Sequence, residues 1–302
     1  MTADRKLLEA RVLAGHGRRF VVETGDGMRL TCLTAARSLQ PVCGDRLRVD
    51  PGAALIRALL PRRSLFSKAD ARGKARPIAA NLDLVLVTVA VEPEAQLFLL
   101  DKYLASIAGM GIEAGIVYNK TDLLAGAATP LQRQLAYYRG IGYSVFDVSS
   151  RSGAGLDALK AALAGRMSLL VGQSGVGKSS LLNALVPDAR RRIDELSAIS
   201  GEGKHTTTVT TLHALPGGGE LLDSPGVRDL ALTAVAPRDV ARLFIEFPRH
   251  ASDCRFPDCV HAQEPGCAVQ AAAARGEIPA SRYANYLKLL GAMKKAEKQK
   301  YD

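Results

Sequence analysis

The stretch GQSGVGKSS has the residue types and spacing of a phosphate-binding loop, G-x-x-x-x-G-K-[ST]. Its glycines allow a tight turn that brings backbone N–H groups onto phosphate oxygens. Lys178 would neutralise the β- and γ-phosphates, and the Ser179 hydroxyl would be a Mg²⁺ ligand. A strand pattern precedes the loop and a helix pattern follows it, which disfavours a glycine-rich turn without a nucleotide. The predicted phosphate-binding residues are Gly172, Gln173, Ser174, Gly175, Val176, Gly177, Lys178, Ser179 and Ser180.

A second motif, NKTD, indicates which base the nucleotide carries. The Asp122 carboxylate can accept hydrogen bonds from N1–H and the exocyclic amino group of guanine, whereas adenine offers neither donor there. Asn119 can bond the remaining edge of the base, and the stem of Lys120 can lie over its ring. The base-binding residues predicted for GTP and GDP are Asn119, Lys120, Thr121 and Asp122, with Ser149 and Ser150 at the end of the next strand.

Two further segments have the residues needed to sense the metal and the γ-phosphate. In DSPG, Asp223 ends a strand pattern and can reach Mg²⁺ through water, and the Gly226 N–H can contact the γ-phosphate. In GEGKHTTTVT, one of Thr206, Thr207 and Thr208 can ligate Mg²⁺. The alternative for these threonines is ordinary strand propensity, which holds for some of them.

The order of these motifs along the chain is unusual, because the base-recognition residues precede the phosphate loop. Each motif lies at the carboxyl end of a predicted strand, where open α/β sheets bind ligands. Joining the old termini and cutting the chain elsewhere preserves that geometry, so we predict a circularly permuted GTPase domain over residues 81–236. The pattern predicts strands over 82–91, 113–118, 143–148, 167–171, 208–215 and 220–223, and helices over 94–109, 130–140, 155–165 and 179–185.

The ends of the chain are basic, whereas its middle is nearly neutral. The net charge is +10, and residues 1–80 carry 16 Lys and Arg against 7 Asp and Glu. Residues 1–61 show strand patterns over 18–24, 28–33, 44–50 and 53–60, which favour a five-stranded barrel of the oligonucleotide-binding type. Residues 62–80 read as a basic linker without a clear period. Basic ends suggest a polyanion partner, with solvated basic faces as an equal alternative, and Arg18, Arg19, Arg62 and Arg63 are the candidate RNA-binding residues.

A cluster of cysteines near the C-terminus has the composition of a metal site. Cys254, Cys259, His261 and Cys267 offer three thiolates and one imidazole, the ligand set of a closed structural Zn²⁺ site. The alternative is three buried free cysteines near a histidine. Helix patterns over 238–247 and 281–300 surround the cluster, so residues 237–302 are predicted to be a helical zinc-binding domain with a basic terminal helix. Cys32 and Cys43 stand apart and are expected to be packed thiols.

The chain as a whole is predicted to be a multidomain α/β protein of the cytoplasm. Its N-terminus lacks the apolar core of a signal peptide. Its longest apolar stretch, Leu82 to Val91, is far shorter than the roughly 20 residues of a membrane span. No heptad pattern stands out, so we expect a monomer.

The motifs NKTD, GQSGVGKSS, GKHTTT and DSPG and the Cys-His cluster, in this order behind a basic barrel, resemble the RsgA (YjeQ) family of bacteria. The resemblance covers nearly the whole chain. It implies a slow GTPase that binds the 30S ribosomal subunit and its 16S rRNA, is stimulated by 30S, and acts in late subunit maturation. It also implies one structural Zn²⁺ ion, and Mg²⁺ bound with GTP.

The family resemblance also suggests a catalytic residue. Val227 stands where a Ras-like GTPase has a water-positioning glutamine, and an apolar side chain cannot orient water. His205 matches the histidine that the family is thought to use in catalysis; the alternative is a solvated loop residue.

Three other hypotheses remain open at this stage. GTP could be an affinity-setting ligand of an RNA-binding module in which hydrolysis is incidental. An ATP-dependent or DNA-directed factor is also conceivable, although NKTD opposes ATP. Because DSPGVRD leads directly into residues 237–302, the γ-phosphate could also move the C-terminal domain as a lever.

Overall fold

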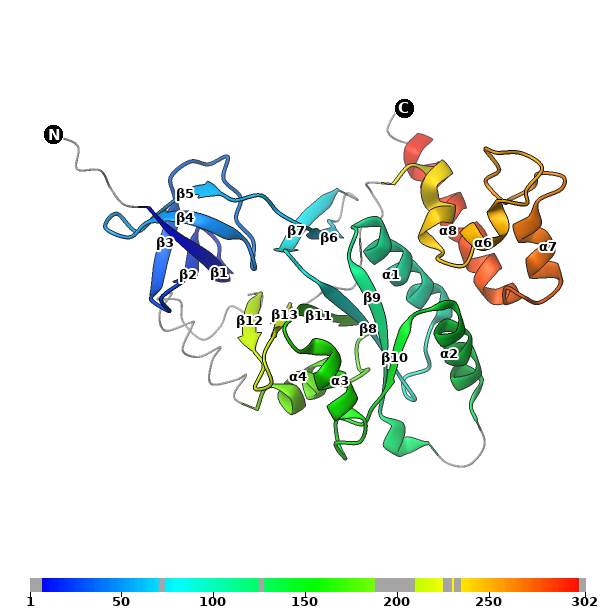
Figure 1. Ribbon diagram of the computed structural model, residues 1–302, viewed down its shortest axis with the longest axis horizontal. Helices are drawn as coiled ribbons and strands as arrows, with labels where there is room; N and C mark the ends of the chain where they lie inside the picture. The colour runs from blue at the N-terminus through cyan, green and yellow to red at the C-terminus, as the bar shows by residue number, and fades with distance from the viewer. Residues whose placement is uncertain are drawn as a thin grey trace.

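The computed structural model describes residues 7–70, 74–124, 128–187, 210–224, 230 and 235–298. Figure 1 shows an elongated molecule with three parts in a row: a barrel at the N-terminal end, a central α/β module, and a helical C-terminal module. We use "barrel" for residues 8–59, "central module" for residues 84–223 and "C-terminal module" for residues 235–298.

The barrel consists of five short strands, as the sequence predicted. They are β1 (Leu8–His16), β2 (Arg19–Thr24), β3 (Arg29–Thr34), β4 (Arg46–Asp50) and β5 (Leu55–Leu59). Their order is β1-β2-β3-β5-β4, and an additional pairing of β1 with β4 closes the barrel. Alternate residues point inward, so that Val12, Val22, Cys32, Leu47 and Ile56 form a core with no exposed surface. Strand β1 was not among the strands predicted.

The segment between the barrel and the central module contains a β-hairpin. Strands β6 (Leu65–Ala69) and β7 (Ala75–Ala80) pair antiparallel, and a bulge between Phe66 and Ser67 shifts their register. From the sequence we predicted only a basic linker here, without a regular alternation of polar and apolar residues. The bulge explains the missing alternation, because an extra residue interrupts the two-residue repeat of a strand. Phe66 and Ala79 are fully buried, so the hairpin is part of the core.

The central module is a mostly parallel sheet with helices on both faces. Its strands are β8 (Leu84–Ala90), β9 (Glu113–Asn119), β10 (Ser144–Asp147), β11 (Met167–Gly172), β12 (Thr211–Ala214) and β13 (Glu220–Asp223). Its helices are α1 (Leu97–Gly109), α2 (Pro130–Ile141), α3 (Leu156–Leu163) and α4 (Lys178–Leu185), with a short 3₁₀ turn η1 (Thr121–Leu123). Residues of α1 and α2 pack in one core cluster and those of α3 and α4 in another. All residues of β8 and β11 are buried, as expected for strands covered on both faces.

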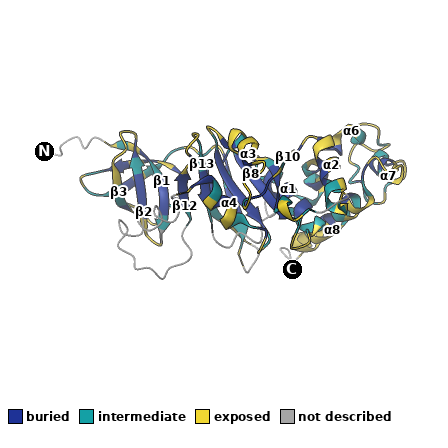
Figure 2. Cartoon of the chain, turned by 90° about the horizontal axis from the view of Figure 1, so that it is seen from below, coloured by how far each residue is buried: buried dark blue, intermediate teal, exposed yellow. Residues whose placement is uncertain are grey.

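The barrel and the central module share one continuous sheet. Its order is β10-β9-β8-β11-β13-β12-β1-β2-β3-β5-β4, so β12 links the central module to β1 of the barrel. Figure 2 shows these strands side by side along the long axis, with buried residues running through both parts.

The C-terminal module consists of η2 (Pro237–Leu243), α6 (Pro248–Ala251), α7 (Ala268–Ala274) and α8 (Ala280–Lys298). Phe244, Phe247 and Tyr286 pack their rings together in its core, with centroids 4.9–5.3 Å apart. The helix predicted over 238–247 is instead a 3₁₀ helix that ends at Leu243. The chain becomes extended at Phe244, so that both phenylalanines can enter the core. The long terminal helix agrees with the prediction.

Within the residues that the structure describes, no helix combines the length and apolarity needed to cross a bilayer.

Candidate functional site

The predicted phosphate loop joins the end of β11 to the start of α4. Its backbone needs glycine at two positions. Gly172 has a φ of 144°, and a Cβ there would lie 2.3 Å from the Thr88 carbonyl oxygen. Gly177 has a φ of 92°, and its Cβ would lie 2.3 Å from Nδ2 of Asn119. The Lys178 ammonium donates to the carbonyl oxygens of Gly172 (2.8 Å) and Gln173 (2.6 Å), which holds its charge at the loop.

Asn119 connects the predicted base-recognition loops to the phosphate loop. It ends β9 and is fully buried. Its side-chain amide donates to the Val176 carbonyl oxygen (2.9 Å), and its Oδ1 accepts from the Ser150 N–H (3.1 Å). The structure thus brings the three predicted segments together. Asn119 thus holds the two neighbouring loops through one donated and one accepted hydrogen bond.

Asp122 and Ser149 form the second contact among the base-recognition residues. The Ser149 hydroxyl donates to Oδ1 of Asp122 (2.5 Å), and Ser149 itself is buried while Asp122 is exposed. Lys120 adopts a left-handed φ of 63°, which turns the chain sharply into η1. The Asp122 carboxylate is therefore oriented by a buried hydroxyl while its remaining lone pairs face solvent, as a base reader requires.

On the metal side of the site, Asp223 ends β13 next to the phosphate loop. Burial raises the pKa of the Asp223 carboxyl, and the nearby Lys178 ammonium lowers it. A partly buried carboxylate of this kind gains from a neighbouring cation, so the residues fit a divalent ion. Ser179, the other predicted Mg²⁺ ligand, is exposed in the first turn of α4. His205, Thr206, Thr207 and Gly226 lie outside the described residues.

Sheet topology explains why residues so distant in sequence meet. Strands β10, β9, β8, β11 and β13 are neighbours and parallel. Their carboxyl ends therefore lie at one edge of the sheet, and these ends lead into Ser149, Asn119, Gly172 and Asp223. Because this arrangement does not depend on where the chain begins, the fold is that of a circularly permuted GTPase.

The four predicted metal ligands form one cluster in the C-terminal module. The ligand atoms of Cys254, Cys259, His261 and Cys267 all lie within 4.8 Å of one another. His261 Nδ1 lies 3.5 Å from the Cys254 sulfur and 3.4 Å from the Cys267 sulfur, and those two sulfurs are 4.0 Å apart. A tetrahedral ion with Zn–S bonds of about 2.3 Å and Zn–N bonds of about 2.0 Å needs ligand separations of about 3.5–3.8 Å. The cluster fits such an ion.

Surrounding groups support the cluster. The backbone N–H of Ala268 donates to the Cys254 sulfur, and that of Gln270 to the Cys267 sulfur, each at 3.4 Å. Hydrogen bonds of this kind stabilise cysteine thiolates that bind a metal ion. The Glu264 carboxylate accepts three backbone N–H bonds, of which the shortest is 2.8 Å from Ala262, and so orders the loop between the ligands. Glu264 was missed by the sequence analysis, since its role depends on loop conformation.

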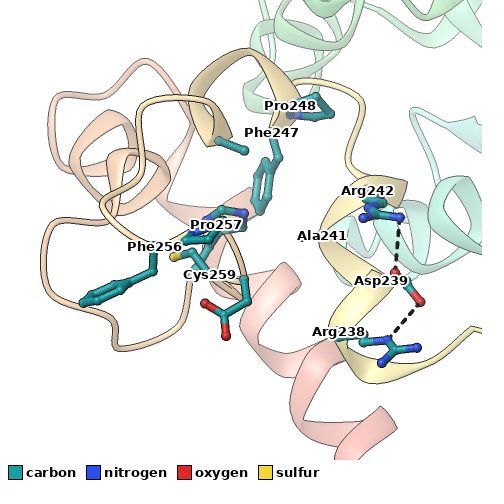
Figure 3. Close-up of a pocket in the computed structure, with 12 residues that line it drawn as sticks. Arg238, Asp239, Ala241, Arg242, Phe247, Pro248, Phe256, Pro257 and Cys259 are labelled. Atoms are coloured by element: carbon teal, nitrogen blue, oxygen red, sulfur yellow. Dashed lines mark ion pairs between the residues drawn. The ribbon is translucent and has the colours of Figure 1, made fainter.

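A cavity of about 630 Å³ lies between η2 and the metal loop. Figure 3 shows Arg238 and Arg242 on one wall, each paired with Asp239. Pro257 and Cys259 lie across from the arginines, and the Phe256 ring points away from them. Two arginines and two aspartates, Asp239 and Asp258, line the cavity, so its charges balance.

The structure separates the four predicted RNA-binding arginines into two kinds. Arg62 donates to both carboxylate oxygens of the buried Asp45 (2.7 Å each) and to the Gln40 carbonyl oxygen (2.9 Å). Three of its five N–H groups are thus used within the protein, which makes it a structural residue of the barrel. Arg63 also bonds within the protein, to the Asp83 carboxylate (2.8 Å) and the Asn81 carbonyl oxygen (3.3 Å), but its side chain is 69% exposed. Arg18 and Arg19 are exposed at the β1–β2 turn.

Comparison with known proteins agrees with this geometry. Residues 59–233 match the family described as RsgA GTPase. The small ribosomal subunit biogenesis GTPase RsgA of Chromohalobacter salexigens is 46% identical over 284 residues, which cover 91% of this chain and 83% of the relative. The protein of the same name from Pseudomonas aeruginosa is 41% identical, with 94% of this chain and 85% of the relative covered.

Two solved structures share the fold of this chain over nearly its whole length. The crystal structure of YjeQ from Thermotoga maritima is 31% identical and superposes with a TM-score of 0.78, covering 95% of this chain and 99% of the other. YloQ, described as a circularly permuted GTPase, is 24% identical with a TM-score of 0.76 and 98% of each chain covered. The latter likeness concerns the fold alone.

Proposed function

This chain belongs to the RsgA family of GTPases, and from that premise we propose that it is a GTP-driven switch for biogenesis of the small ribosomal subunit. In this proposal the protein acts in the cytoplasm as a monomer. It binds the 30S subunit through 16S rRNA, and 30S stimulates its slow hydrolysis of GTP. The relatives' names and the basic N-terminal residues support the ribosomal part. One observation supports the nucleotide part above all: buried Asn119 bonds both the phosphate loop and the Ser150 loop.

Each residue of the nucleotide site takes a role in this proposal. Asp122 reads the guanine edge, oriented by Ser149, while the Asn119 amide holds the two loops at the correct spacing. Backbone N–H groups of residues 172–180 and the Lys178 ammonium bind the phosphates. We call residues 201–209 the first switch and residues 224–229 the second switch. Ser179 and Asp223 hold Mg²⁺, with Thr206 or Thr207 from the first switch, and Gly226 of the second switch binds the γ-phosphate. When bound, Mg²⁺ neutralises charge that develops on the phosphate oxygens.

Hydrolysis in this proposal depends on a residue outside the phosphate loop. Val227 cannot orient a water molecule, so the intrinsic rate is low. His205 is the proposed water-positioning group, and binding of 30S brings it into place.

The Cys254, Cys259, His261 and Cys267 cluster is proposed to hold one structural Zn²⁺. With four protein ligands the ion has no open position for water, so it supports folding of the C-terminal module and not the chemistry. On the barrel, Arg18, Arg19 and Arg63 are the proposed RNA-facing residues.

GTP turnover, measured for the protein alone and with 30S subunits, tests the proposal. We expect strong stimulation by 30S that a His205→Ala variant loses. His250→Ala is the matched control, since His250 is paired with Glu277 in the C-terminal module (3.8 Å) and takes no part in the site. Stimulation that survives in His205→Ala would remove the catalytic role of that histidine.

Equal and negligible turnover in every sample would favour the second candidate, an RNA-binding module for which GTP sets affinity. The position of Val227 is the observation that favours it. Base recognition is tested separately with Asp122→Asn, which should weaken GTP binding by about 10- to 100-fold and favour xanthine nucleotides. Tight ATP binding by the unmodified protein would contradict guanine recognition.

A further inference from the structure

Strand β1 of the barrel lies beside a second hairpin, formed by β12 and β13, which joins the two predicted switch segments. In this subsection and in the Discussion, "the hairpin" means β12–β13. Thr211 begins β12, directly after the first switch and Thr210, and Asp223 ends β13 just before the second (Figure 1). Ala14 of β1 pairs with Thr211, and Thr211 pairs with Asp223. Three residues on neighbouring strands thus lie in one row. At about 5 Å per strand, the barrel backbone is about 10 Å from the backbone of Asp223.

The ends of β12 and β13 are also tied to each other at this row. The Thr210 hydroxyl and the Ser224 hydroxyl lie within hydrogen-bonding distance at 3.1 Å. These residues flank the paired Thr211 and Asp223, so the exits toward both switch segments are held together. A shift of one exit therefore displaces the other.

The far end of the same hairpin is held by an ion pair with the barrel. Arg11 of β1 bonds the carboxylate of Glu220, the first residue of β13. Glu220 is three residues before Asp223 on the same strand. The two side chains are 33% and 19% exposed, so solvent screens this pair less than a fully exposed one.

Arg11 belongs to a row of alternating charges that continues into the barrel. It lies opposite Glu23 on β2, with nitrogen and oxygen 3.8 Å apart, and Glu23 pairs with Arg29 on β3 at 3.1 Å. The order Glu220, Arg11, Glu23, Arg29 runs from β13 of the hairpin to β1, β2 and β3 of the barrel, and the Arg11–Glu220 pair reaches across β12, which lies between β13 and β1. Cross-strand pairs of opposite charge stabilise sheets, and here they fix Arg11 from the barrel side.

Apolar packing makes this junction stiff. Leu13 and Val21 of the barrel, Leu212 and Leu222 of the hairpin, and Leu230 beyond it belong to one buried cluster. Close-packed side chains resist sliding, so this packing adds to the ion pair in coupling the hairpin to β1.

We propose that Arg11 and Glu220 are positioning residues of the GTPase site, which hold β13 so that Asp223 stays in place for Mg²⁺–GTP. The inference rests on the proposed role of Asp223. It has a consequence for the barrel, because the β1–β2 turn with Arg18 begins a few residues after Ala14. RNA bound at that turn and Mg²⁺–GTP bound at Asp223 act on the same strand, and by linkage each changes the affinity of the other by one common factor.

Binding of two ligands by the full chain, without RNA, tests the positioning role. GTP with excess Mg²⁺ depends on Asp223, whereas GDP with EDTA does not. For Arg11→Ala we expect about threefold to tenfold weaker binding of Mg²⁺–GTP and unchanged binding of GDP in EDTA. Arg11→Lys, which keeps a cation between Glu220 and Glu23, should recover at least half of the loss. Arg275→Ala, which removes an exposed ion pair with Glu277 in the C-terminal module, should bind both ligands as the unmodified chain does.

Unchanged Mg²⁺–GTP affinity in Arg11→Ala would overturn the inference. So would a parallel loss of both affinities with a lowered melting temperature, which is the result expected of a merely structural pair. If the unmodified chain binds GTP no better with Mg²⁺ than without it, the proposed metal side of the GTPase site fails, and the inference fails with it.

Discussion

On the barrel side, the central module continues into its neighbour through main-chain pairing, whereas on the C-terminal side it meets its neighbour through side chains. The barrel contact is the β1–β12 pairing with the Arg11–Glu220 ion pair. The C-terminal contact is centred on Arg282 of α8, which bonds Glu246 at 2.5 and 2.9 Å and also bonds Asp101 of α1. All three charged side chains are only 2% exposed.

Aromatic and polar groups complete the Arg282 contact. The guanidinium carbon lies 5.0 Å from the ring centre of Tyr138 on α2 and 4.7 Å from that of Phe244. Asp101 also accepts from the Tyr138 hydroxyl (2.5 Å) and from the Asn285 amide (2.6 Å). Every charge in this contact has a partner, as buried ions require.

The two contacts lie on different parts of the central module. The barrel pairs with β12, which is the last strand of the central module on that side of the sheet. β12 in turn neighbours β13, the strand that ends in Asp223. The C-terminal module rests on α1 and α2, which pack on the half of the sheet that carries base recognition. We infer that the neighbour placed to respond to the metal and γ-phosphate is the barrel, and that Arg282 keeps the C-terminal module fixed.

Metal removal gives the largest expected effect on this comparison. Structural zinc contributes about 10–16 kcal/mol in small zinc peptides, so a strong chelator should unfold the region around the cluster. Three thiols should then react with a thiol reagent and about one Zn²⁺ should be released. Cys32 and Cys43 should stay unreactive, because they are 0% and 3% exposed and burial raises the pKa of both thiols.

GDP binding, which does not depend on Mg²⁺, should survive chelation, because the nucleotide site shares no residue with the cluster. Reaction of all five thiols, or loss of GDP binding, would show that the C-terminal contact supports the whole chain and not one end of it.

Arg282→Ala is expected to have the next largest effect. Removing one partner leaves Asp101 and Glu246 buried without their cation, which costs about 3–5 kcal/mol in unfolding free energy. Arg275→Ala is the matched control, since its pair with Glu277 is 58% and 47% exposed and its loss should leave the free energy of unfolding nearly unchanged. Urea unfolding measures both values, and limited proteolysis should release the C-terminal module from Arg282→Ala alone. A loss below about 1 kcal/mol would contradict the assignment of Arg282 as the anchor.

A smaller effect separates Arg62 from Arg63 on the barrel side. Arg62→Ala leaves the buried Asp45 with only its Val42 N–H bond (2.7 Å), so we expect about 2–3 kcal/mol of destabilisation. Arg63→Ala should change stability by about 0.5 kcal/mol or less, because its side chain is 69% exposed. RNA binding should show the reverse, with a salt dependence reduced in Arg63→Ala by about one phosphate contact. Equal destabilisation by both variants would contradict this distinction.

The short motifs of the candidate site could be predicted from the sequence. Gly172 and Gly177 are needed for backbone conformations that glycine favours, and residues 119–122 follow an apolar strand, so both motifs were visible as short patterns. The order of motifs was enough to predict the permutation. The Cys-His cluster was also visible, because its four ligands lie within 14 residues.

The contacts between the parts were not visible in the sequence. Arg282 and Asp101 are 181 residues apart, and Arg11 and Glu220 are 209 apart, so no local pattern links them. From the sequence, Arg62 was predicted to be one of several basic residues that bind a polyanion. Its contact with the buried Asp45 carboxylate depends on the fold. Strand β1 was missed too. It belongs to a closed barrel and also pairs with β12, and both roles depend on the tertiary structure.

The smallest expected effect decides between the lever hypothesis and the barrel coupling. When a non-hydrolysable GTP analogue replaces GDP, we expect amide exchange to slow by about two- to tenfold in residues 10–16 of β1 and 211–214 of β12. Exchange in residues 280–298 of α8 should stay the same, because the Arg282 contact holds that helix against α1 whichever nucleotide is bound. The lever hypothesis predicts the opposite pattern, with protection changing in residues 237–298. In Arg11→Ala the change in β1 should become smaller while that in β12 persists, since the nucleotide still acts on the hairpin but only the β1–β12 pairing and the apolar contacts then connect it to the barrel.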